Sequence, residues 1–122
     1  MTYILSQKSL DKLKGVDDRL VSVVKRAIEI TTEDFTVLEG LRTKERQLEL
    51  YNAGKSQTLN SKHLVGRAVD LGALNNGVIS WDKEDYIKLA VVVKQAAKEL
   101  NVNIRWGGDF KSFFDGPHFE LV

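Results

Sequence analysis

Side chains that offer nitrogen or sulfur to a metal are few in this sequence, and their positions limit how the chain can fold. Among its 122 residues there are two histidines, His63 and His118, and no cysteine. Each histidine has carboxylates nearby along the chain, Asp70 after the first and Asp115 and Glu120 around the second. A catalytic transition-metal site would need both histidines and a carboxylate, which is a known ligand set of catalytic zinc. Such a site requires the middle of the chain to lie against its C-terminal segment.

Length and composition predict one globular domain covering residues 1–122. The chain is 43% hydrophobic and 29% charged, and its formal net charge is +1. This balance gives no reason to expect nucleic acid or an anionic membrane as a partner. The N-terminal residues lack the basic and apolar regions of a signal peptide, and no stretch approaches the ~20 apolar residues of a membrane span. We therefore expect a soluble protein that stays in the cytoplasm unless another protein releases it.

Apolar periodicity predicts two helices in the first part of the chain, over residues 6–14 and 16–30. The second helix carries an apolar stripe typical of core packing, formed by Leu20, Val23, Val24, Ala27 and Ile28. The β-branched and aromatic residues 35–39 predict a strand. Thr43 is a suitable N-cap for a helix over 44–52, and the polar stretch 53–61 predicts a loop.

A hairpin is predicted in the middle of the chain, where segments 68–71 and 78–81 alternate between apolar and polar residues. The tight-turn signal Asn75-Asn76-Gly77 lies between them, so we expect two paired antiparallel strands. Further elements are predicted after the hairpin: a helix over 82–100 capped by Ser80 or Asp82, and strands over 103–106 and 117–121. Helices and strands do not alternate as parallel βαβ units would require, which favours an α+β fold with a small antiparallel sheet.

Three large aromatic residues are expected to belong to the core rather than to bind ligands: Trp81, Trp106 and Phe119. In the helix over 82–100, the expected core face consists of Leu89, Val92, Val93, Ala96 and Leu100.

Side-chain alternation brings the candidate ligands together. In both strands the apolar neighbours should point to the core, which leaves Asp70 on the opposite face of one strand and His118 and Glu120 on that of the other. If the two strands are neighbours, Asp70 and His118 can meet over the sheet. Gly66 allows the backbone to turn, so that the imidazole of His63 can join them. The alternative, that both histidines are ordinary structural side chains, stays open at this point.

The chemistry of a zinc hydrolase needs further groups beside the ligands. A three-ligand zinc keeps a position for water, activates that water and polarises a carbonyl. Asp115 is placed to act as the general base, with Glu120 as the competing base or as support for a ligand. A cation is also needed near the developing oxyanion or a substrate carboxylate, and Arg42 is a better candidate for it than Arg67 or Arg105.

Several separated motifs resemble one known family. They are Ser61-x-His63-x-x-Gly66-x-Ala68-x-Asp70, then Trp106-Gly-Gly-Asp109, and then Asp115-x-Pro-His118-Phe-Glu. In this order they resemble the zinc D-Ala-D-Ala carboxypeptidase and L-alanyl-D-glutamate endopeptidase family, and most closely its short bacteriophage endolysin branch. The similarity includes Gly40-x-Arg42-Thr43, Gln47, Leu50-Tyr51 and Gly54-x-Ser56, and so spans about residues 35–122. The chain departs from the family at Phe110, where tryptophan is commoner.

The resemblance implies a Hedgehog/DD-peptidase-like α+β fold and a zinc ion (Zn2+) with three protein ligands: His63, Asp70 and His118. Asp115 would be the general base and acid. Arg42 would bind the substrate or stabilise its transition state, and Ser61 would be a supporting polar residue near the substrate. The implied reaction is cleavage of the L-Ala–D-Glu bond in peptidoglycan stem peptides, through a metal-activated water, during host cell lysis.

Two alternatives to this function stay open. The same site could serve a D,D-carboxypeptidase or dipeptidase, or the fold could be a non-catalytic, zinc-stabilised cell-wall-binding module. For the endolysin we expect a monomer without a separate cell-wall-binding domain. It would neither bind nucleic acid nor insert into the membrane, and it would reach the periplasm after a separate holin permeabilises the membrane.

Overall fold

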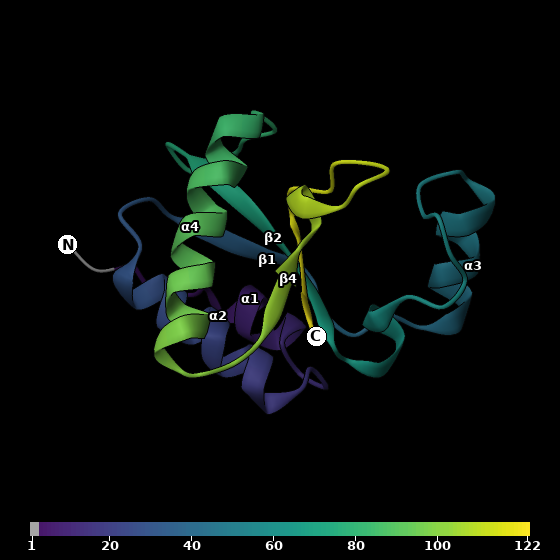
Figure 1. The fold of residues 1–122 in the computed structure, drawn as a ribbon, viewed down its shortest axis with the longest axis horizontal. Coiled ribbons are helices and arrows are strands. Elements are labelled where there is room, and N and C mark those ends of the chain that lie inside the picture. Colours follow the sequence, from purple (N-terminus) through teal and green to yellow (C-terminus); the bar gives the residue numbers. More distant parts are fainter. Residues whose placement is uncertain (1–2) are drawn as a thin grey trace.

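The computed structural model describes residues 3–122 and shows an antiparallel sheet with helices packed against it (Figure 1). The elements, in chain order, are α1 (Gln7–Lys12), α2 (Asp18–Ile30), β1 (Phe35–Glu39), α3 (Lys44–Asn52), the 3-10 turn η1 (Lys62–Val65), β2 (Ala68–Asn75), β3 (Val78–Ile79), α4 (Lys83–Glu99), β4 (Ile104–Trp106), the 3-10 turn η2 (Gly107–Asp109) and β5 (His118–Leu121). The strand order is β1-β2-β5-β4, and β3 pairs with β2. All these pairs are antiparallel, which confirms the predicted α+β class.

The core lies between the sheet and the helices α1, α2 and α4. The predicted stripe of α2 is fully confirmed, since all five of its residues are buried. In α4 the buried face is shifted toward the start of the helix and includes Tyr86, Leu89 and Val93, whereas Leu100 is exposed, contrary to expectation. Asp82 occupies the N-cap position of α4, but its side chain makes no capping hydrogen bond.

The prediction that Trp81 belongs to the core is wrong. Its side chain is 69% exposed, whereas Trp106 and Phe119 are buried as expected. The predicted strand 78–81 ends at Ile79, and both residues of β3 are exposed because this short strand pairs only with β2. Neither face of β3 packs on the core, so alternation along it does not bury a side chain.

The helix α3 is set apart from the other helices, with the strands between them (Figure 1). Its bounds and its N-cap are as predicted, with the Thr43 hydroxyl accepting a hydrogen bond from the backbone of Arg46. Only Gln47 of this helix is buried. Within residues 3–122, no helix combines the length and the apolar character needed to cross a membrane.

Candidate metal centre

The pairing of β2 with β5 brings the first two candidate ligands together. Asp70 lies directly opposite His118 in the register, and their neighbours Val69 and Phe119 also form a pair. Val69 and Phe119 are completely buried on the core side. The side chains of Asp70 and His118 therefore share the other face, as alternation along each strand predicts.

The third candidate ligand, His63, lies in the turn η1 just before β2. The hydroxyl of Ser61 caps this turn by accepting a hydrogen bond from the His63 backbone at 3.2 Å. Gly66 ends the turn with a φ of +70°, a left-handed conformation that glycine adopts at little cost. This bend is the one that the sequence predicted, and it directs His63 back over Asp70.

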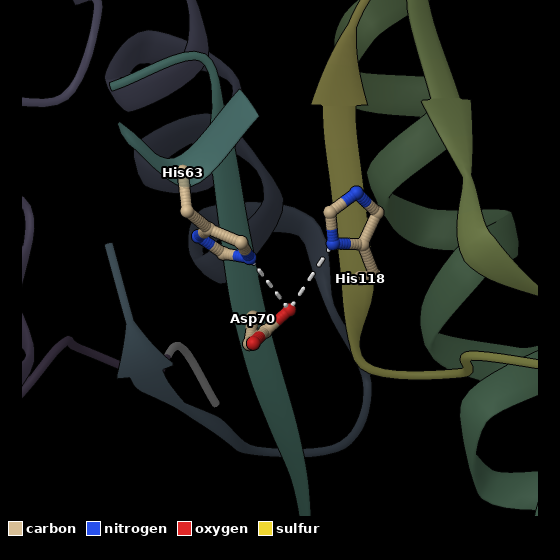
Figure 2. A group of neighbouring side chains, drawn as sticks. All are labelled: His63, Asp70 and His118. Atoms are coloured by element: carbon tan, nitrogen blue, oxygen red, sulfur yellow. Dashed lines mark hydrogen bonds and ion pairs between the residues drawn. The ribbon is translucent and has the colours of Figure 1, made fainter. Parts of the chain in front are cut away.

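The three side chains converge on one point (Figure 2). Their ligand atoms all lie within 4.8 Å of one another. His63 Nε2 is 3.3 Å from Asp70 Oδ1, and His118 Nδ1 is 3.4 Å from the same oxygen. Two imidazole nitrogens thus approach one carboxylate oxygen from different elements of the fold.

The outer hydrogen bonds of the two imidazoles determine which nitrogens carry protons. His63 Nδ1 lies 2.9 Å from the Gly40 carbonyl oxygen, and His118 Nε2 lies 2.7 Å from Glu120 Oε1. A carbonyl and an ionised carboxylate only accept hydrogen bonds, so both of these nitrogens are the donors. In the neutral rings the inward nitrogens then present lone pairs toward the Asp70 carboxylate. A zinc ion bound here would take both lone pairs and the Asp70 carboxylate as ligands, and the outer hydrogen bonds of the two rings fit the support that zinc-binding histidines usually have.

The charges around this cluster follow the same pattern. Burial raises the pKa of the Asp70 carboxyl, but the two histidines outweigh it and hold that pKa well below its usual range. Burial lowers the pKa of His118, and the Asp70 and Glu120 carboxylates outweigh it in turn and raise that pKa. Glu120 also pairs with Lys62 at 3.0 Å. The Asp70 carboxylate is thus held ionised by the two histidines, and Glu120 behind His118 is paired with the positive charge of Lys62.

A pocket of about 690 Å³ opens over the cluster. Its wall includes the three candidate ligands and Asp115, and it extends to α3 and the loop that follows α3. The backbone of Asp115 is fixed by its N–H, which donates to the Gly107 carbonyl at 3.0 Å. Burial and the negative charge of Asp70 both raise the pKa of the Asp115 carboxyl. A carboxylate with a raised pKa inside a pocket is suited to proton transfer.

Comparisons with known proteins identify the family. The sequence profile of the phage L-alanyl-D-glutamate peptidases matches residues 1–122. The chain belongs to the phage L-alanyl-D-glutamate peptidase family.

Individual relatives agree with this membership. The L-alanyl-D-glutamate peptidase of Escherichia phage T5 is 31% identical over 137 residues, and the alignment covers 100% of both chains. The L-alanyl-D-glutamate peptidase of Listeria phage A118 is 30% identical over 126 residues, covering 99% of this chain and 43% of that protein. The crystal structure of the Serratia marcescens L-Ala D-Glu endopeptidase ChiX superposes with a TM-score of 0.92 at 44% identity, covering 98% of this chain and 90% of that one.

Within this family member, Arg42 lies beside the cluster rather than free in the pocket. Its guanidinium pairs with Glu39, reaches Asp70 Oδ2 at 3.5 Å and donates to Gln47 Oε1 at 2.8 Å. The side chain is 8% exposed and lines the pocket. The two weaker cation candidates, Arg67 and Arg105, do not line the pocket, and Arg105 instead stacks over Phe110.

Sequence reasoning did not find the polar support of Arg42. Glu39 gave one available signal, because its spacing of three residues places it to pair with Arg42 across the end of β1. Gln47 was part of the resemblance, but no role followed from it. In the structure its amide joins Arg42 to Ser56 Oγ, at 2.8 Å, and to the Thr58 carbonyl, at 2.5 Å. The hydroxyl of Ser61 caps η1, and Ser61 also lines the pocket, as a residue near the substrate would.

Proposed function

We propose that this protein is an endolysin of the zinc-dependent L-alanyl-D-glutamate endopeptidase type, with peptidoglycan stem peptides as its substrate. The observation that carries the proposal is the convergence of two imidazole lone pairs on the Asp70 carboxylate, next to Asp115, in a pocket of about 690 Å³. Membership of the L-alanyl-D-glutamate peptidase family supports the choice of scissile bond.

The two histidines and Asp70 would hold the zinc ion, with Gly40 and Glu120 fixing the imidazole rings from behind. When bound, the zinc supplies Lewis acidity that activates water and polarises the scissile carbonyl. Asp115 accepts the proton of the attacking water on a carboxylate oxygen and then donates it to the amine of D-Glu as the C–N bond breaks. The raised pKa of Asp115 brings its carboxyl closer to the working pH, which suits a group that acts first as a base and then as an acid.

Arg42 and Ser61 complete the proposed machinery. Arg42 would place positive charge beside the reacting carbonyl or a substrate carboxylate, held in position by Glu39 and Gln47. Ser61 would contribute through the turn that presents His63, and its side of the pocket would contact the peptide. We also propose that residues 1–122 act as one catalytic domain and as a monomer, reaching the wall after a separate holin has permeabilised the membrane.

The deciding experiment compares wild type with Asp115→Ala and His118→Ala. Zinc content is measured by elemental analysis, and activity by turbidity loss of Gram-negative-type sacculi. We expect Asp115→Ala to retain zinc and lose activity by about 10²- to 10⁴-fold, the range for a general acid–base group. His118→Ala should lose both the zinc and the stabilisation that zinc provides, which is measured as a lower melting temperature.

The products and the metal content distinguish the alternatives. Release of L-Ala from a free stem peptide indicates the proposed endopeptidase, whereas release of terminal D-Ala indicates the carboxypeptidase. If zinc-loaded wild type cleaved no muropeptide, the non-catalytic cell-wall-binding module would be the remaining hypothesis. If Asp115→Ala kept the wild-type rate, the base would be assigned wrongly and Glu120→Gln would be tested next.

A further inference from the structure

Exposed aromatic side chains gather at the end of the molecule where the loop before β5 meets the start of α4. Among the described residues, four aromatic side chains count as exposed, and three of them lie here: Trp81, Phe113 and Phe114. We refer to these three as the aromatic rim. Single exposed apolar residues are common, but several large rings at one place are typical of an interaction site.

Trp81 is held in place rather than free to turn. Its ring stacks on Tyr86 with a centroid distance of 6.2 Å and an interplanar angle of 17°. The Tyr86 hydroxyl donates to the Ser80 carbonyl at 2.7 Å, which fixes the segment that carries Trp81. Tyr86 is itself 2% exposed. One face of the Trp81 indole thus packs on the Tyr86 ring, and the rest of the side chain is open to solvent.

The aromatic rim is continuous with the wall of the catalytic pocket. A Cβ at Gly116 would lie 2.9 Å from Tyr86 Cβ, so the loop next to Asp115 packs directly on the ring that supports Trp81. Phe114 packs edge-on against Trp106 at 5.7 Å, and Lys83 Nζ lies 4.9 Å from the Phe114 ring centroid. Phe113 and Phe114 also line the pocket. The rim therefore leads from the side of the proposed base out to Trp81.

The opposite wall of the pocket has a different character. Apart from Leu50, its lining from α3 and the following loop is polar or charged: Arg46, Lys55, Ser56, Gln57, Thr58 and Asn60. These groups suit the carboxylates of a stem peptide after the scissile bond. The aromatic rim offers instead flat apolar surface with an adjacent amine, which suits the apolar face of a sugar ring.

The chemistry of the substrate connects these two walls. In peptidoglycan the amino group of L-Ala is bonded, through a lactyl ether, to an N-acetylated amino sugar of the glycan strand. The sugar is therefore separated from an L-Ala–D-Glu bond by a single amino acid. We propose, resting on the proposed function, that the aromatic rim binds this amino sugar through Trp81 and Phe114, which orients the stem peptide from the rim toward α3.

The experiment uses two substrates that share the scissile bond. One is the disaccharide tripeptide GlcNAc–MurNAc–L-Ala–D-Glu–meso-diaminopimelate, and the other is the same tripeptide without sugar. The variants are Trp81→Ala, the conservative Trp81→Phe and the control Val91→Ala. The control removes a 65% exposed side chain from α4, the helix that begins just after Trp81. The quantity compared is kcat/KM for the disaccharide tripeptide divided by kcat/KM for the tripeptide without sugar.

We expect Trp81→Ala to lower this ratio by about tenfold through a higher KM for the disaccharide tripeptide, which is the scale of one aromatic contact. Trp81→Phe should restore most of the ratio, and Val91→Ala should keep it. Binding is read separately in the zinc-loaded Asp115→Ala background, which should bind the disaccharide tripeptide without cleaving it, by titrating this ligand and recording tryptophan fluorescence. Trp106 is 7% exposed, so a change that is lost in Trp81→Phe reports on Trp81.

An unchanged ratio in Trp81→Ala would overturn the proposal. If both kcat/KM values then fell by the same factor, the indole would have a structural role; if neither fell, it would have no role in cleavage. Cleavage of the tripeptide by wild type tests the proposed function independently. Failure of the amino-sugar proposal and failure of the proposed function are therefore distinguishable. In the first case wild type still cleaves the sugar-free tripeptide, and in the second it does not.

Discussion

The helices α2 and α3 follow the same local rules but are held in the molecule by different forces. Each begins at a side-chain cap: Asp17 caps α2, and Thr43 caps α3 as the sequence predicts. Beyond the cap they differ, because α2 buries five apolar side chains and α3 buries only Gln47. Burial of apolar surface is the dominant favourable term in folding, so α2 is part of the core and α3 is not.

Hydrogen bonds do for α3 what apolar contacts do for α2. The buried amide of Gln47 contacts Arg42, Ser56 and Thr58, and so joins the helix to the loop that follows it. A typical intramolecular hydrogen bond contributes only about 0.5–1.5 kcal/mol net. The wall of the pocket that α3 forms is therefore the less stable side, and the sheet that carries the proposed ligands is the more stable one. Binding surfaces are commonly drawn from such less stable parts of a fold.

The largest expected difference between the helices is in global stability. Leu20→Ala in α2 truncates a side chain with no exposed surface and should cost about 2–5 kcal/mol of unfolding free energy. Leu48→Ala in α3 truncates a 50% exposed side chain and should change that free energy by no more than about 0.5 kcal/mol. Urea unfolding of both variants measures the difference. Equal losses would show that α3 contributes to the core.

A smaller effect is expected when the polar support of α3 is removed. Gln47→Ala leaves the partners of a buried amide unsatisfied, which should cost about 1–3 kcal/mol. The loss should be local, so amide hydrogen exchange should speed up in α3 and in residues 53–60 but not in α2. Glu49→Ala is the control, since it removes an exposed side chain of the same helix. Faster exchange throughout the chain would instead place Gln47 among the residues that hold the whole fold.

The smallest effect concerns the two caps and depends on pH. Hydrogen bonds from Arg19 lower the pKa of Asp17 to about 2. A lowered pKa in the folded state means that the stability gained from the Asp17 cap is present above about pH 4 and is lost as pH falls toward 2. Thr43 does not titrate, and Thr43→Ala should cost about 0.5–2 kcal/mol at any pH.

Thermal melts from pH 7 down to pH 2 measure this difference. The deficit of Asp17→Ala relative to wild type should shrink on acidification, whereas that of Thr43→Ala should stay constant. A constant deficit for Asp17→Ala would show that the carboxylate charge does not contribute to its cap.

Sequence patterns predicted those parts of the molecule in which periodicity reports burial. The bounds of β1 and α3, the stripe of α2 and the shared face of Asp70 and His118 all follow from such patterns. The expectation for Trp81 fails because β3 ends at Ile79 and pairs only with β2, so alternation over 78–81 does not report burial. The contacts of Arg42 with Glu39 and Gln47 have no periodic signature, since they join an end of a strand, a loop and a helix. Only the folded chain shows them.

The bend at Gly66 ties the proposed zinc site to a part of the chain that the pocket never touches. None of the pocket-lining residues in the described chain precedes Leu38. Yet the Gly15 carbonyl fills the space that a side chain at Gly66 would need, and the Asp17 N–H donates to the Gly66 carbonyl at 2.8 Å. A truncated protein of residues 35–122 would keep every proposed zinc ligand. It would lose the contacts of Gly15 and Asp17 with Gly66, which hold the turn that carries His63. The two N-terminal helices therefore belong in the smallest version of this protein that an engineer could graft onto another.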